Sequence, residues 1–191
     1  MAQNFTLGGL TTEDYRPTEV LATLVGHHRV PGTIAASSRP IRLGDILAKD
    51  SNSGKIMVRR HTLLSAQGSS SDTTIHVDDP WAWAVGDPIQ VVGESATTVK
   101  SIDYDAKTIE LNAALTGTRA IGVVVKDATY SRDVAVGIHS LGDPVPSKAV
   151  AQTIAVCVSG TFMYDKVRNL DAAAISDLHG MANATMNILK I

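Results

Sequence analysis

The sequence Gly44-Asp45-Ile46-Leu47 has two counterparts further along the chain, Gly86-Asp87-Pro88-Ile89 and Gly142-Asp143-Pro144-Val145. In each of them a Gly-Asp pair precedes a short apolar stretch. Glycine adopts the positive φ that a tight turn needs, and the aspartate side chain accepts hydrogen bonds from nearby backbone. The apolar residues that follow predict strands leaving these turns. The repeat therefore indicates a mainly β protein built from short hairpins.

The composition is typical of a soluble globular protein. The chain has 191 residues, which allows one large domain or two small ones, and its hydrophobic content of 44% is too high for a disordered chain. Its net charge of −2 gives no electrostatic signal for nucleic acid, so we expect no direct nucleic-acid binding. Two short basic clusters, Arg59-Arg60-His61 and His27-His28-Arg29, are expected to be solvated surface.

The single cysteine limits the disulfide chemistry of the protein, and its uncharged segments indicate where in the cell it is located. Cys157 has no intramolecular disulfide partner, and its apolar neighbours predict a buried, inert thiol. The N-terminus lacks the basic start and apolar run of a signal peptide. The longest uncharged run, residues 149–164, is shorter than the ~20 residues that a membrane span needs. We therefore expect no membrane association and a cytosolic location where the protein is made.

The N-terminal 28 residues differ in pattern from the rest of the chain. Residues 1–28 are polar and show no periodicity, and Pro17 interrupts them. They predict an extended arm that becomes ordered against a partner. A frayed terminus is the alternative. The side chains expected to make contacts with that partner are Phe5, Leu7, Leu10 and Tyr15.

Two β units follow the arm. Residues 29–69 and 119–191 predict an outer β domain. It contains a hairpin around the turn at residues 50–54 and later strands at 120–125, 134–138 and 152–158. Gln67–Asp72 is expected to be a flexible joint. Residues 70–118 predict an inserted small β-barrel or sandwich with strands at 74–77, 89–92, 97–102 and 108–111.

The C-terminal region predicts one short helix and a final strand. Asn169 is a suitable N-cap for a helix that ends near Gly180. Leu170, Ala174 and Leu178 have the spacing of one helix face. Residues 185–191 then predict the last strand.

No motif specifies a catalytic, metal or cofactor site, so we predict a protein that is not an enzyme and needs no cofactor. The adjacent His27 and His28 would point to opposite faces of a strand. Asp103-Tyr104-Asp105 begins like a calcium loop but lacks the glycine and the distant glutamate. Trp81 and Trp83 form a possible stacking platform for a sugar or base, although packing within the inserted domain is favoured.

Four stretches of the chain resemble the head decoration (cement) proteins of tailed bacteriophages, the lambda-type group. They are residues 15–21, residues 41–55, the strand pair at 120–124 and 132–136, and the helix at 169–180 with the end at 187–191.

The resemblance implies a β-tulip fold and homotrimers seated on the major capsid protein at three-fold sites of an icosahedral shell. It also implies a location on the capsid exterior, synthesis in the host bacterial cytoplasm, and no catalysis. The chain departs from the family by its insert at 70–118, which implies an additional outward knob. The alternative hypothesis is a receptor- or carbohydrate-binding module of a phage fibre or surface protein, with Trp81 and Trp83 as its platform.

Overall fold

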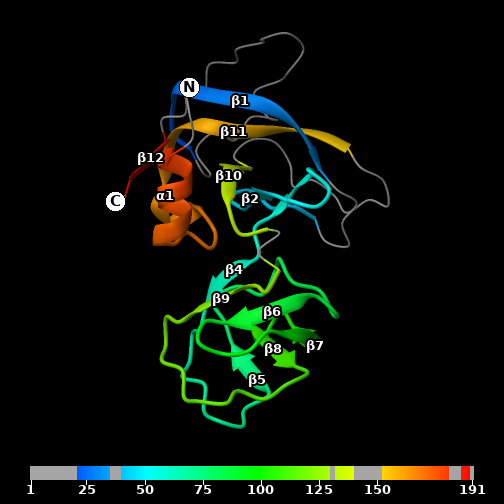
Figure 1. The fold of residues 1–191 in the computed structure, drawn as a ribbon. Helices are drawn as coiled ribbons and strands as arrows, with labels where there is room; N and C mark the ends of the chain where they lie inside the picture. Colours follow the sequence, from blue (N-terminus) through cyan, green and yellow to red (C-terminus); the bar gives the residue numbers. More distant parts are fainter. Residues whose placement is uncertain (1–20, 35–39, 130–131, 140–151, 181–185, 190–191) are drawn as a thin grey trace.

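The protein folds into two β-barrels joined end to end (Figure 1). This computed structural model describes residues 21–34, 40–129, 132–139, 152–180 and 186–189. The strands are β1 (Leu21–Ile34), β2 (Ile46–Lys49), β3 (Ile56–Val58), β4 (His61–Leu63), β5 (Thr74–His76), β6 (Pro88–Val91), β7 (Thr97–Asp103), β8 (Thr108–Leu111), β9 (Val124–Asp127), β10 (Ala135–Ile138), β11 (Gln152–Met163) and β12 (Met186–Leu189). The helical segments are the 3₁₀ turn η2 (Tyr164–Lys166) and α1 (Ala172–Gly180). The prediction of a mainly β fold with one short helix near the C-terminus is confirmed.

The first barrel consists of β1, β2, β3, β10 and β11. Its strand order, β1-β3-β2-β10-β11, closes on itself because β11 also pairs with β1. The long strands β1 and β11 run antiparallel from Leu21↔Phe162 to Ile34↔Gln152. β12 extends the sheet by pairing in parallel with β11.

The first barrel is buried on two faces. Leu47 and Val156 belong to the cluster inside the ring of strands, whereas their neighbours Ile46 and Cys157 belong to a second cluster outside it. Helix α1 covers this second cluster. Burial on both faces explains why the segment around Cys157 is continuously apolar instead of alternating. The predicted burial of Cys157 is confirmed, with 0% of the residue exposed.

Helix α1 begins two residues later than an N-cap at Asn169 would place it. Asn169 has a φ of +55°, outside the extended region that an N-cap residue adopts. Asp171 is the cap instead, because its Oδ1 accepts a hydrogen bond from the Ala174 N–H at 2.7 Å. The predicted face is confirmed: Ala174 and Leu178 are fully buried, and Leu170 packs against the same cluster.

The second barrel is a closed antiparallel ring with the order β4-β9-β6-β7-β8-β5. The bridge Leu64↔Val77 brings β5 back beside β4, with the Asp78 N–H donating to the Leu63 carbonyl at 3.0 Å. The interior is filled by apolar side chains: Leu64, Ile75, Val77, Trp83, Ile89, Val91, Val99, Ile109, Leu111, Leu115 and Val125. The predicted hairpin at 97–111 is confirmed as β7 and β8.

The structure corrects three boundaries of the predicted units. Residues 21–28 belong to β1 and not to an arm. The expected joint at 67–72 lies inside the second barrel, because Gly68 exchanges two backbone hydrogen bonds with Arg119. The segment at 124–127, expected in the outer domain, is β9 of the second barrel and pairs with β4 and β6. The inserted unit therefore spans residues 61–127, because its ring closes only with β4 and β9 included.

Two of the three Gly-Asp pairs form the predicted turns, and they have the same geometry. Gly44 and Gly86 have φ values of +84° and +85°. In the first turn the Asp45 carboxylate accepts a hydrogen bond from the Arg42 N–H at 2.7 Å. Asp87 accepts from the Ala84 N–H at 2.7 Å in the second. The third pair, Gly142-Asp143, lies outside the described residues.

The two turn glycines differ in their surroundings, which makes them a matched pair for substitution. A Cβ at Gly44 would lie 2.1 Å from the Lys166 carbonyl oxygen, whereas a Cβ at Gly86 would have no neighbour within 4 Å. We expect Gly86→Ala to lower the free energy of unfolding by about 1–2 kcal/mol through left-handed strain alone. Gly44→Ala should cost a further ~3 kcal/mol through overpacking. Urea unfolding followed by tryptophan fluorescence measures both, and equal losses would contradict the close approach at Gly44.

Candidate functional site

The junction between the barrels is built around Arg59 and Arg60, which connect β3 to β4, and His61, the first residue of β4. Only 2%, 7% and 5% of these residues are exposed, respectively, so the expectation of a solvated basic cluster is wrong. The three side chains lie where the chain passes from the first barrel to the second, and groups from both barrels enclose them. Buried cations require partners, and the surrounding aspartates supply them.

Arg59 and His61 connect this crossing to helix α1 through Asp171. Arg59 Nη1 lies 3.1 Å from Asp171 Oδ2, and Arg59 Nε donates to the Asp133 carbonyl at 2.6 Å. His61 Nδ1 lies against the same Asp171 carboxylate. Burial alone would raise the pKa of Asp171. The hydrogen bonds from His61 and the Ala174 N–H, together with the charge of Arg59, hold that pKa well below its usual value.

Arg60 points into the second barrel. Its Nη1 donates to Asp127 at 3.1 Å, and its Nη2 lies 2.5 Å from Asp87. The guanidinium carbon lies 5.8 Å from the centroid of the Trp83 ring. Arg60 therefore links the crossing segment to β9 and to the second Gly-Asp turn.

Arg42 makes a second connection between the barrels. Its Nη2 lies 2.5 Å from Asp79 of the second barrel and 3.0 Å from Asp45 of the first Gly-Asp turn. The Arg42 guanidinium also lies over the Trp81 ring at 4.4 Å. Trp81 Nε1 in turn donates to the Pro40 carbonyl at 2.9 Å. Both barrels are thus tied together at two places.

These contacts contradict the tryptophan platform. Trp83 is 1% exposed and lies in the core of the second barrel, so its face is not open to a ligand. Trp81 is half-buried and packs at the junction, edge-on to Tyr104 at 6.0 Å between ring centroids. The two indoles lie in a turn, in which the Trp83 N–H donates to the Pro80 carbonyl, and not in an extended segment. The favoured expectation, packing within the inserted unit, is the one observed for Trp83.

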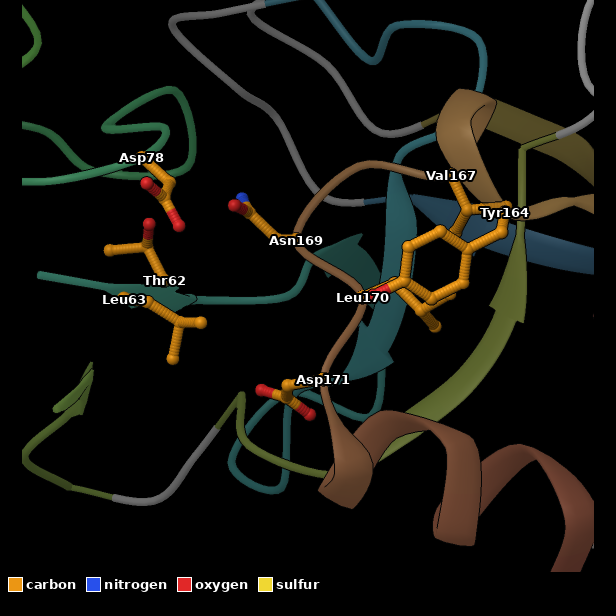
Figure 2. A pocket seen from close by; sticks show the side chains of 8 residues that line it. All are labelled: Thr62, Leu63, Asp78, Tyr164, Val167, Asn169, Leu170 and Asp171. Atoms are coloured by element: carbon orange, nitrogen blue, oxygen red, sulfur yellow. The ribbon is translucent and has the colours of Figure 1, made fainter. Parts of the chain in front are cut away.

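A cleft of about 260 Å³ lies beside the junction, between β4 of the second barrel and the loop that precedes α1 (Figure 2). Its lining combines polar and apolar side chains from both barrels: Thr62, Leu63, Asp78, Tyr164, Val167, Asn169, Leu170 and Asp171. Figure 2 shows the Asn169 amide extending from the loop toward Asp78 and Thr62 on the opposite wall. Tyr164 is 40% exposed at this cleft.

The loop that carries Asn169 is held at both ends. Before it, the Arg168 N–H donates to the Gly44 carbonyl at 2.9 Å. After it, Asp171 caps α1 and binds Arg59. Asn169 has a φ of +55°, in the left-handed region. Asparagine adopts this conformation more readily than most residues other than glycine. No local sequence pattern indicates this cleft, because Asp78 and Asn169 are far apart in the chain.

The other residues considered from the sequence add no further site. The predicted contact residues Phe5, Leu7, Leu10 and Tyr15 lie outside the described residues. Within the part of the chain that the structure describes, no three His, Cys, Asp or Glu side chains are grouped to hold a metal ion. None of the helices described there is long and apolar enough to cross a membrane.

Comparison of the chain with protein-family models, with curated proteins and with solved structures finds no match.

Asp171 offers a test of the junction, because it is both a helix cap and an ion-pair partner. Asp171→Ser keeps a capping oxygen but leaves Arg59 unpaired in a buried position, so we expect a loss of about 3 kcal/mol in the free energy of unfolding. Asp171→Ala should lose about 1 kcal/mol more. Glu110→Gln is the control: it removes a pair with Lys100, whose side chain is 57% exposed, and solvent screening should leave the free energy of unfolding nearly unchanged. Similar effects of Asp171→Ser and Glu110→Gln would contradict a structural role for the buried pair.

The same pair predicts a dependence on pH. Because folding lowers the pKa of Asp171, its charge stabilises the folded state fully above its ordinary value of 3.8, and this contribution is lost as the pH falls below that value. The stability difference between wild type and Asp171→Ser should thus be constant near neutral pH and decrease under acidic conditions. Denaturation curves over a pH series measure it. A difference that grows on acidification would exclude the ion pair as its source.

Proposed function

We propose that this protein is a structural virion protein that binds the outside of an icosahedral phage capsid as a homotrimer and stabilises the shell. The major capsid protein is its partner in this proposal, and no catalysis is involved. The four stretches that resemble phage head decoration proteins are the starting point. The absence of matches in the comparisons leaves this resemblance and the geometry of the two barrels as its support.

The observation that carries the proposal is the buried connection between two closed barrels. The second barrel is fixed to the first by Arg59, Arg60 and Arg42, so it projects from the first barrel as one unit. Its interior is filled by side chains, as in other small barrels, and not by a ligand cavity. Among the described residues, the strands of the second barrel close into a ring and so present none of the free strand edges that promote uncontrolled association in a crowded lattice. These features suit a protein displayed at high density.

Exposed apolar side chains provide surfaces for partners. Five large ones are exposed among the described residues: Val85, Val92, Ile121, Val134 and Tyr164. Val92 and Val134 line a second cleft of about 320 Å³, together with Ala173 of α1. A protein that is repeated over a shell binds through many modest contacts, so contacts of this size are sufficient. We assign these surfaces to neighbouring copies or shell subunits.

The abundance of the protein in particles tests the proposal. We expect its copy number in purified virus particles of its source to be comparable with that of the major shell protein, measured by stained-gel densitometry. Only a protein that binds across the whole lattice reaches such a number. A handful of copies would contradict decoration and indicate a fibre or tail component, and absence from particles would exclude a virion role.

The N-terminal segment provides a second test. Deletion of residues 1–20 removes Phe5, Leu7, Leu10 and Tyr15 but leaves β1 intact. We expect the shortened protein to unfold at the same denaturant concentration as the full chain but to lose co-sedimentation with shells stripped of this protein. A variant with only these four residues changed to alanine should behave alike. Unchanged co-sedimentation of both would contradict the role of the arm.

A further inference from the structure

We propose that the cleft between Asp78 and Asn169 binds one sugar ring of a glycan. This site is separate from the tryptophans considered from the sequence, and the inference does not depend on shell binding. It rests on the size of the cleft, on the mixture of polar and apolar side chains that line it, and on the fixed position of the loop on one side of it.

The size of the cleft fits a single small ring. Its volume of about 260 Å³ is slightly below the range of ~300–1,000 Å³ that is typical for drug-sized ligands. It lies open between two barrels and is not an enclosed cavity, so a ring within a longer glycan has room for its neighbouring units to extend into solvent.

The polar side chains of the cleft suit hydroxyl groups. The Asp78 carboxylate accepts hydrogen bonds, and the Asn169 amide both donates and accepts them. Thr62 also lines the cleft, although it is only 2% exposed, and its Oγ1 accepts a bond from the Asp79 N–H at 3.1 Å. Sugar hydroxyls likewise act as donors and acceptors, and Figure 2 shows these three side chains facing a common space.

The apolar side chains of the cleft suit the C–H face of a sugar. Leu63 lies on the β4 side and Leu170 on the loop side, and Tyr164 is 40% exposed. Val167 also lines the cleft but is 7% exposed. A tyrosine ring combines an apolar face with a polar hydroxyl, and it therefore packs well against a ligand of mixed character.

The charge of the cleft favours a neutral ligand over a cation. Asp171 is already paired with Arg59 and His61, so its charge is compensated within the protein. Asp78 is exposed at the rim, where water and salt screen it. One screened carboxylate is a weak basis for binding a cation, and it is sufficient as a hydrogen-bond acceptor for hydroxyls.

The site is also organised before a ligand arrives. Asn169 is held in its left-handed conformation between the backbone bond of Arg168 to Gly44 and the cap at Asp171. A loop fixed in this way loses little freedom on binding, which favours affinity.

The test is saturation-transfer difference NMR of the full chain with a panel of free pyranoses: glucose, galactose, mannose, rhamnose and N-acetylglucosamine. We expect at least one of them to bind with a Kd on the order of 1 mM. Asp78→Asn replaces one carboxylate acceptor by an amide donor, and Asn169→Gly removes the amide while keeping the left-handed backbone, which glycine accepts. Each should weaken binding ~10-fold, the effect expected from the loss of one ligand hydrogen bond.

Asp105→Asn is the matched control, since Asp105 is an exposed carboxylate at the tip of the β7–β8 hairpin, away from the cleft lining. It should leave binding unchanged. Absence of saturation transfer for every sugar, or equal binding by wild type, Asp78→Asn and Asn169→Gly, would overturn the proposal. Co-sedimentation of Asp78→Asn and Asn169→Gly with stripped shells should remain at the wild-type level, so failure of this site and failure of the decoration role are distinguishable.

Discussion

Pairing of buried charge at the crossing between the barrels constrains the whole molecule. Removing a guanidinium from water is costly, and it is tolerated only where carboxylates and carbonyls replace the lost hydration. Arg59 and Arg60 are neighbours in sequence but point to opposite sides, one to Asp171 beside the first barrel and the other to Asp127 inside the second. A rotation of one barrel against the other would separate at least one buried charge from its partner. The ion pairs of Arg59 and Arg60 therefore fix the position of one barrel relative to the other, although each barrel has its own core.

The candidate site depends on the same constraint. Its walls come from β4 on one side and from the loop between η2 and α1 on the other, and neither wall alone forms a cleft. Asp171 takes part in both arrangements, since it anchors the crossing through Arg59 and ends the loop that carries Asn169. The ion pair between Arg59 and Asp171 therefore both stabilises the junction of the barrels and fixes the position of the loop that forms one wall of the cleft.

The sequence predicted what is determined locally. Three features depend on residues that are a few positions apart, so the sequence pattern predicts them. They are the turns at Gly44 and Gly86, the hairpin at 97–111 and the buried face of α1. The buried state of Arg59 was missed because its partner Asp171 lies 112 residues away. The cleft was missed for the same reason. No local pattern distinguishes a buried basic residue from a solvated one when the charge that pairs with it comes from another part of the fold.

The second barrel begins and ends at adjacent positions. β4 and β9 are neighbouring antiparallel strands, with His61 opposite Lys126, so the chain enters and leaves this unit at the same place. All strands of the first barrel lie before or after that point in the sequence. A single insertion or deletion at this site adds or removes the whole projection without changing the strand order of its host. The position of these two strands makes the projection an exchangeable module, and the first barrel a scaffold whose strand pairings do not include any strand of that module.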